Sequence, residues 1–289
     1  CGATYYYISY ETVDARGALI QASGTVWIPR LVRPMPMVAY CHGTHLDTDT
    51  TLLHIHCGLF AARGFITAGA DYLGYGDSGH VYHPYCHAAT LASSTIDCIR
   101  AAKKFAEYNG IYHDGKLFVT GISEGGMAAM ATVRELELNY AAEHPLLAAA
   151  PISGPYDMTS TANYYIVPNK TLTGGQLNYM VFIMPAYLEL YGSTNPLGNY
   201  IKEPYATWFT EDRYPRPDGG QVSSQIPNNT SNLMTASFIT SYQGSGEADM
   251  KAALAENNTY NFVPRCRIRL YAATRSEERR VGKECRSRW

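Results

Sequence analysis

The sequence is poor in charge and has no long apolar run, and both shortages narrow the class of protein. Charged residues make up 17% of the 289 residues and the net charge is −2, so we expect no nucleic-acid partner. No apolar run approaches the ~20 residues that a membrane-spanning helix needs, so we expect no stable membrane insertion. The hydrophobic share of 46% is enough for a large buried core, and we expect a small-molecule ligand.

Phenylalanine is also scarce, with 8 residues against 24 tyrosines. Tyrosine suits surfaces and pockets in which one end of the ring stays wet, which fits a ligand cleft without proving one. The chain begins at Cys1 without a methionine or a signal peptide, so we expect a processed or incomplete N-terminus.

Glycosylation triplets fit export from the cell, and we expect a secreted or periplasmic protein. The triplets begin at Asn169, Asn228, Asn229 and Asn257. Disulfides are compatible with this location. Six of the seven cysteines remain once Cys285 is set aside with the tail described below, and six cysteines allow 15 pairings.

The most informative stretch is residues 116–127, KLFVTGISEGGM. An apolar run at 117–120 leads into Gly121-Ile122-Ser123-Glu124-Gly125, and a helix-forming segment follows, so we predict a strand, a tight turn and a helix. In such a nucleophile elbow the serine adopts φ > 0, and the flanking glycines avoid collisions with the strand and the helix. We interpret Ser123 as a nucleophile. The alternative is a glycine-rich turn with an ordinary serine.

Segments typical of strands and helices alternate on both sides of this elbow. After an antiparallel hairpin of residues 5–10 and 21–29, we predict strands at 37–40, 65–70, 116–120, 146–152 and 266–273 and helices at 52–63, 88–109, 127–138 and 248–256. This alternation indicates an α/β fold with a mostly parallel central sheet flanked by helices.

The alternation stops after residue 157. Residues 158–245 are rich in Pro, Gly, Asn, Tyr and Thr, and only 179–191 is typical of a helix. We interpret 158–245 as a cap inserted over the active site, between a first core segment, 1–157, and its continuation, 246–274. A distorted continuation of the core is the alternative.

The predicted strand at 37–40 runs directly into Cys41-His42-Gly43-Thr44. Ligands of open α/β sheets bind at the carboxyl ends of the strands. A glycine at this point lets the next backbone N–H face a reacting carbonyl, so the N–H groups of Thr44 and Glu124 are candidate oxyanion donors. A simple glycine turn is the alternative.

His42, His45, His54, His56 and Cys57 crowd together in the sequence and invite a metal hypothesis. His54 and His56 fall in a predicted helix, where positions i and i+2 face different sides, whereas zinc motifs on helices use i and i+3 or i+4. We therefore predict no metal and no cofactor, and interpret these residues as structural or surface histidines.

The last residues, 275–289, read RSEERRVGKECRSRW and differ abruptly in composition from the rest, with six basic and three acidic residues. The peptide resembles the in-frame translation of a sequencing-adapter oligonucleotide, so we expect it to be non-native and leave it out of the fold. A tail that binds nucleic acid or membrane is the alternative that we reject.

Five motifs in order carry a resemblance to a known family. They are CHGT at 41–44, DYLGYGDSG at 71–79, HPYCH at 83–87, TGISEGG at 120–126 and SGPYDM at 153–158. Their order resembles that of α/β-hydrolases of the secretory lipase and esterase type, over residues 5–274. The resemblance implies a Ser-His-Asp esterase or lipase with an inserted cap. We also expect His42, Gly43, Tyr72 and Tyr156 to bind substrate.

The sequence lacks two members of that triad. The fold orders its triad as serine, acid and histidine along the chain, and the resemblance places the acid after the strand at 266–273 and the histidine later, where neither is found. Of the nine histidines only His144 follows Ser123, in a link that we expect at the opposite edge of the sheet. We therefore expect a C-terminally truncated, inactive chain, with His42 or His45 as the only substitute base.

The leading hypothesis is a serine hydrolase that cleaves carboxylic esters, with a small ester or lipid as substrate. A serine peptidase on the same fold uses the same triad, so the elbow does not separate the two. A non-catalytic binding protein of this fold is the third hypothesis, and the intact elbow argues against it. The sequence does not indicate an oligomeric state.

Overall fold

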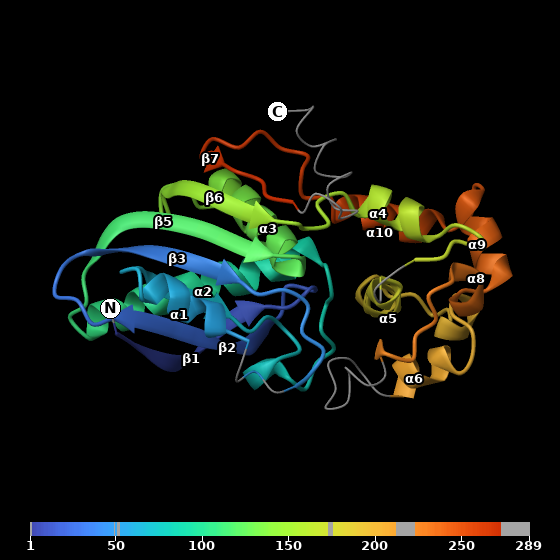
Figure 1. Cartoon of the computed structure of the whole chain (residues 1–289), viewed down its shortest axis with the longest axis horizontal. Coiled ribbons are helices and arrows are strands. Elements are labelled where there is room, and N and C mark those ends of the chain that lie inside the picture. Colours follow the sequence, from blue (N-terminus) through green and yellow to red (C-terminus); the bar gives the residue numbers. More distant parts are fainter. Residues whose placement is uncertain (1, 49, 51–52, 173–175, 212–222, 273–289) are drawn as a thin grey trace.

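The computed structural model describes residues 2–48, 50, 53–172, 176–211 and 223–272. A twisted seven-stranded sheet forms one side of the molecule, and a group of helices forms the other (Figure 1). The predicted tail, 275–289, and Ala273 lie outside the described residues. No helix in the described part of the chain combines the length and apolarity needed to cross a membrane.

The sheet has the strand order β1-β2-β4-β3-β5-β6-β7. Its strands are β1 Ala3–Val13, β2 Leu19–Pro29, β3 Met35–Cys41, β4 Ile66–Ala70, β5 His113–Ile122, β6 Leu146–Ile152 and β7 Arg267–Ile268. The β1–β2 hairpin joins the sheet antiparallel to β4, and the pairs from β4 to β7 are parallel. The predicted α/β fold with a mostly parallel central sheet is confirmed, and β5 lies inside the sheet.

Three helices connect the core strands, as parallel strands require. They are α1 Ile55–Ala61, α2 Ala88–Tyr108 and α3 Glu124–Asn139. The helix α2 packs against β1, β4 and α3, whereas α3 packs against β5 and β6. Every residue of β4 is buried, which explains why this strand is an unbroken run of apolar and small residues.

Two predicted elements differ from the structure. The helix predicted for 52–63 is described from Ile55 to Ala61, and Leu52 lies outside the described residues; the side chain of His54 binds Asp71 and caps no helical N–H. The strand predicted for 266–273 is reduced to β7, although Arg269 and Tyr271 still donate their backbone N–H groups to the carbonyls of Ala149 and Pro151.

The second group of helices lies beyond the carboxyl ends of the parallel strands (Figure 1). It comprises α4 Met158–Tyr165, α5 Asn178–Leu190, α6 Tyr205–Glu211, α8 Thr230–Leu233, α9 Ala236–Gln243 and α10 Ala248–Glu256, with a short 3₁₀ turn at Leu197–Asn199; another, Gly76–Ser78, lies between β4 and α2. Most of its apolar side chains share a hydrophobic cluster distinct from that of the sheet, and α5 supplies the largest run of buried residues. The boundaries of the cap, 158–245, remain our interpretation.

Candidate active site

Ser123 stands between the end of β5 and the start of α3. Its φ is +59° and its ψ is −124°, so the backbone takes the left-handed turn that a nucleophile elbow requires. The N–H of Ser123 donates to the carbonyl of Ile152 at 2.9 Å, and its own carbonyl accepts from Gly126 N–H at 2.8 Å. The strained residue is thus fixed on both sides, to β6 and to the first turn of α3.

Glycine is required on both sides of the serine because backbone atoms pass within contact distance. A Cβ atom on Gly121 would lie 2.2 Å from the carbonyl oxygen of Gly125, and one on Gly125 would lie 2.1 Å from that of Cys41. Neither approach is sterically possible, and backbone cannot move aside as a flexible side chain can. Positions 121 and 125 are therefore glycine because any side chain there would collide with backbone carbonyl oxygens.

The hydroxyl of Ser123 is available for chemistry. The side chain is partly exposed, and it caps no helical N–H although Ser123 occupies the N-cap position of α3. Among the described residues Oγ has no hydrogen-bond partner. A nucleophile needs such freedom, but it also needs a base within hydrogen-bond reach.

The loop after β3 lies directly against the elbow. A Cβ atom on Gly43 would be 2.9 Å from the carbonyl oxygen of Ile122 and 3.5 Å from Cβ of Ser123. The structure therefore brings together Gly43 and Ser123, which are 80 positions apart in the sequence. Thr44 is the next residue of this loop, and the oxyanion role of its N–H stays a prediction.

Both residues with a predicted oxyanion N–H are held by one loop, residues 83–86. The side-chain hydroxyl of Thr44 bonds the phenol of Tyr85 at 2.7 Å. The carboxyl of Glu124 bonds Nε2 of His83 at 2.9 Å and accepts from Cys86 N–H at 3.3 Å. The sequence alone indicates no role for His83 or Tyr85. The motif at 83–87 singled out this segment, but local sequence carries no signal for contacts across 41 residues.

Three residues predicted to bind substrate are buried, with about 2% of each side chain exposed or less. His42 stacks on Tyr72 with ring centroids 4.1 Å apart, and the phenol of Tyr72 donates to the carbonyl of His42. Tyr156 packs against Met130 in a small cluster of its own. This burial argues against substrate contact by His42, Tyr72 and Tyr156, and leaves Gly43 as the predicted substrate residue beside the serine.

His42 does not replace the missing base, because both of its ring nitrogens face backbone carbonyls. Nδ1 lies 2.8 Å from the oxygen of Gly43 and Nε2 lies 3.1 Å from that of Asp71. Burial and the neighbouring His54 lower the pKa of His42 to about 3. The ring is thus a packing element of the loop after β3.

One member of the histidine cluster, His54, belongs to a buried hydrogen-bond network with Asp71 and Ser23. His54 Nε2 bonds Asp71 Oδ1 at 2.5 Å, and Ser23 donates to Asp71 Oδ2 at 2.6 Å. Burial opposes ionisation of Asp71, but the bonds from His54 and Ser23 outweigh it and lower the pKa of the carboxyl. Within the described ranges, no group of three or more His, Cys, Asp or Glu side chains is arranged to hold a metal ion.

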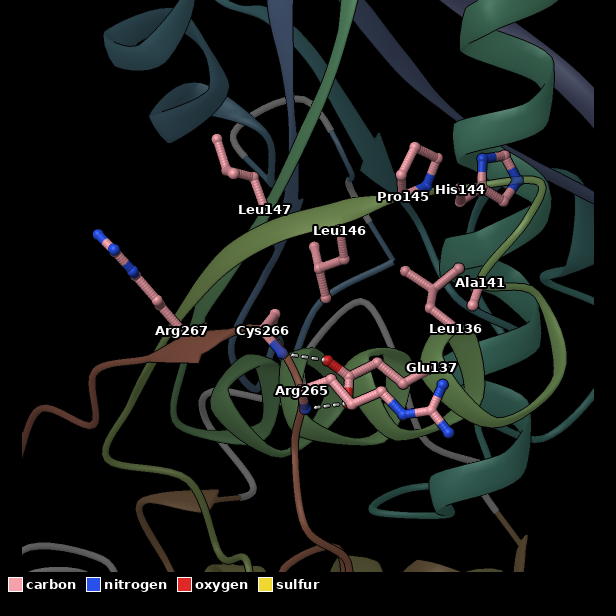
Figure 2. Close-up of a pocket in the computed structure, with 10 residues that line it drawn as sticks. All are labelled: Leu136, Glu137, Ala141, His144, Pro145, Leu146, Leu147, Arg265, Cys266 and Arg267. Atoms are coloured by element: carbon pink, nitrogen blue, oxygen red, sulfur yellow. Dashed lines mark hydrogen bonds between the residues drawn. The ribbon is translucent and has the colours of Figure 1, made fainter.

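His144, the only histidine after Ser123, lies at the opposite edge of the sheet. It precedes β6, whose first residue pairs with Leu117 of β5, whereas Ser123 follows the last pair, Ile122 with Ile152. Five residues of strand separate the two pairs, or about 17 Å. His144 lines a pocket of about 380 Å³ together with Glu137 and Cys266, and Figure 2 shows it on the side of Pro145. There Lys103 donates to its Nδ1 at 2.5 Å, and burial lowers its pKa to about 4.

Comparison with known proteins agrees with this geometry. Residues 53–168 match the model of the prolyl oligopeptidase family. No curated protein sequence matches the chain.

Solved structures extend the likeness to nearly the whole chain. A hydrolase from Legionella pneumophila is 25% identical, with a TM-score of 0.85 over 94% of this chain and 74% of that one. A ligand-bound form of the rice cell wall degrading esterase LipA from Xanthomonas oryzae is 26% identical, with a TM-score of 0.83 over 94% and 75%. Candida antarctica lipase A in its closed state is 16% identical, with a TM-score of 0.68 over 94% and 66%, a likeness of fold alone. The chain therefore has the α/β-hydrolase fold, and these similarities together support a serine hydrolase.

Proposed function

We propose that the chain is a serine hydrolase that cleaves carboxylic esters through an acyl-enzyme on Ser123. The hydroxyl oxygen attacks the ester carbonyl, the alcohol leaves, and water then releases the acid. The N–H groups of Thr44 and Glu124 stabilise the oxyanion that forms at each step. The observation that carries the proposal is the left-handed Ser123, its hydroxyl unpartnered, with Gly43 against it.

An ester substrate is favoured by the likeness to an esterase and, in fold, to a lipase. The match to the prolyl oligopeptidase family supports a second candidate, a serine peptidase. The two reactions share nucleophile and oxyanion hole and differ in the leaving group. We propose a small ester or lipid as substrate, without a cofactor or nucleic acid, in a secreted or periplasmic protein.

The proposal includes inactivity of the chain as it stands. All nine histidines lie among the described residues, and none of them bonds to Ser123 Oγ. A serine without a base loses on the order of 10⁴ to 10⁶ in kcat. The acid and histidine that the resemblance implies after β7 are not among the described residues.

The test is hydrolysis of p-nitrophenyl butyrate with and without added imidazole, in the wild-type chain and in Ser123→Ala. Imidazole supplies the missing base from solution, and Ser123→Ala subtracts the reaction of imidazole itself. We expect no excess over Ser123→Ala without imidazole and a clear excess with it. Equal rates in the two chains at all imidazole concentrations would favour a non-catalytic binding protein.

A second arm separates esterase from peptidase. The same imidazole-dependent rates are measured with an aminoacyl p-nitroanilide of matched acyl size. Ester and anilide differ in their reactivity towards imidazole alone, and Ser123→Ala measures that difference. After this correction, an esterase is expected to hydrolyse the ester much faster than the anilide. A chimera that carries the segment following the last core strand of the Xanthomonas oryzae esterase is expected to hydrolyse the ester without imidazole.

A further inference from the structure

His83 and Glu124 form a buried pair that the proposed chemistry leaves unused. The side chains are 0% exposed, and Nε2 of His83 lies 2.9 Å from Oε1 of Glu124. The other ring nitrogen, Nδ1, lies 2.7 Å from the carbonyl oxygen of Leu73. Glu124 Oε2 has no partner among the described residues. Removing a carboxyl and an imidazole from water costs free energy, which indicates that the pair has a function in this protein.

The hydrogen bonds fix how protons are placed in this pair. The carbonyl of Leu73 only accepts, so Nδ1 of His83 carries a proton and donates it. One further proton lies between Nε2 and Oε1, either as imidazolium with carboxylate or as neutral imidazole with carboxylic acid. The pair has no net charge in either form, which explains how it is tolerated in the interior.

The same loop reaches the other oxyanion residue. The phenol of Tyr85 bonds the hydroxyl of Thr44 at 2.7 Å, and its ring lies edge-on to that of Phe182 in α5, 5.8 Å away. The ring of His83 is itself edge-on to Tyr85 at 5.9 Å. Two adjacent contacts on one rigid segment therefore end on the two residues whose N–H groups must converge.

We propose that residues 83–86 form a clamp that sets the spacing of the oxyanion hole, with His83 and Tyr85 as positioning residues for Glu124 and Thr44. This inference rests on the proposed function. An oxyanion donor works only within about 2.7–3.1 Å of the charge it stabilises, and misplacement by 1 Å costs about 100-fold. Because the loop binds the side chains of Thr44 and Glu124, it fixes the distance between their backbone N–H groups without contacting the substrate.

The first test compares Tyr85, which lies on this loop, with Tyr187, which lies on α5 and bonds to the loop. Tyr85→Phe removes the bond to Thr44, whereas Tyr187→Phe removes a bond of 3.0 Å to the carbonyl of Cys86 and touches neither oxyanion residue. The readout is the rate of covalent labelling of Ser123 by a fluorophosphonate, followed by intact mass in a fixed concentration of imidazole. We expect Tyr85→Phe to slow labelling by roughly 10-fold and Tyr187→Phe to leave it unchanged, with melting temperatures lowered alike.

The second test uses Glu124. In Glu124→Gln only one of the two contacts to Oε1 survives, because the group at that position either donates to Nε2 of a neutral His83 or accepts from Cys86 N–H, so labelling should slow less than in Glu124→Ala. Glu124→Ala removes both contacts and should slow labelling by about 100-fold. The double variant Thr44→Val with Tyr85→Phe should be labelled no more slowly than either single variant, because both substitutions remove the same hydrogen bond.

Each outcome decides between the alternatives. Equal slowing by Tyr85→Phe and Tyr187→Phe, or Glu124→Ala labelled as fast as Glu124→Gln, would overturn the clamp and leave the proposed function intact. Wild type that labels no faster than Ser123→Ala would overturn the proposed function, and the clamp with it. If Glu124→Ala fails to fold, the two phenol variants still give the answer.

Discussion

A side chain on Gly43 would come within 3.5 Å of Cβ of Ser123 and within 2.9 Å of the carbonyl oxygen of Ile122. The residue before the predicted oxyanion donor Thr44 thus packs against the nucleophile elbow without space for one more carbon. The contact links β3 to β5 at the carboxyl edge of the sheet, where α/β folds bind their ligands.

This contact predicts that Gly43→Ala impairs the site. The added methyl must push the two loops apart, which moves Thr44 N–H away from the developing charge, so imidazole-dependent labelling of Ser123 should fall by about 100-fold. Gly198→Ala is the matched control, because a Cβ atom there meets nothing within 4 Å. Labelling of Gly43→Ala at the control rate would show that this loop is not part of the site.

A buried histidine predicts acid sensitivity of the fold. Burial lowers the pKa of His87 to about 4, below its value near 6.5 in the unfolded chain. The unfolded chain therefore binds the proton first as pH falls from 6.5 towards 4, and the native state loses stability over that window. This histidine alone contributes a loss of about 2 kcal/mol between pH 8 and pH 5.

The measurement is urea unfolding of wild type and His87→Asn at the two pH values. His87 caps α2 by accepting from Thr90 N–H, and asparagine is a strong N-cap without a titrating group. Between pH 8 and pH 5, the free energy of unfolding should fall by about 2 kcal/mol less in His87→Asn than in wild type. Identical losses would mean that His87 titrates as it does in the unfolded chain.

The cysteines give a third prediction. Cys41, Cys57, Cys86 and Cys98 are buried and free in the structure, and burial raises the pKa of each thiol, that of Cys41 to about 12. Since the thiolate is the reactive species, iodoacetamide should modify none of them in the native protein at pH 8 and all of them in guanidinium. Site-resolved mass spectrometry reads the result. Modification that requires a reductant would reveal disulfides instead.

Glu137 anchors the segment that leads into β7, the last strand of the sheet. Its carboxylate accepts from the backbone N–H groups of Arg265 at 2.7 Å and Cys266 at 2.6 Å, just before β7 (Figure 2). Glu137→Ala leaves two N–H groups without this acceptor and should cost about 2–4 kcal/mol in the free energy of urea unfolding. Glu135→Ala on the same helix loses only a contact to Asn139 and should cost little. Equal costs would contradict an anchoring role for Glu137.

The elbow and the alternation of strands and helices could be predicted because their signals are local. Gly121 and Gly125 flank Ser123 within a few residues and form a recognisable spacing, although a Cβ atom on Gly125 would collide with the distant backbone of Cys41. The contact of Gly43 with Ser123 followed from the position of each at the end of a parallel strand.

The roles of His42, His83 and Tyr156 could not be predicted, because they depend on packing between distant segments. A histidine beside an oxyanion loop looks the same in the sequence whether it faces solvent or is stacked beneath Tyr72. His83 reaches Glu124 only after α2 and β5 bring the two together. The contact of His54 with Asp71 has the same character, because it joins two segments and no helix propensity encodes it.

The central claim is that Ser123 is a nucleophile in a formed oxyanion hole. The most direct test is peptide mapping of the chain after exposure to a fluorophosphonate in imidazole buffer, with Ser123→Ala in parallel. The account predicts one phosphonyl group per chain, located on Ser123, formed faster as imidazole rises, and absent from the variant. Labelling spread over other serines, or equal in the variant, would contradict it.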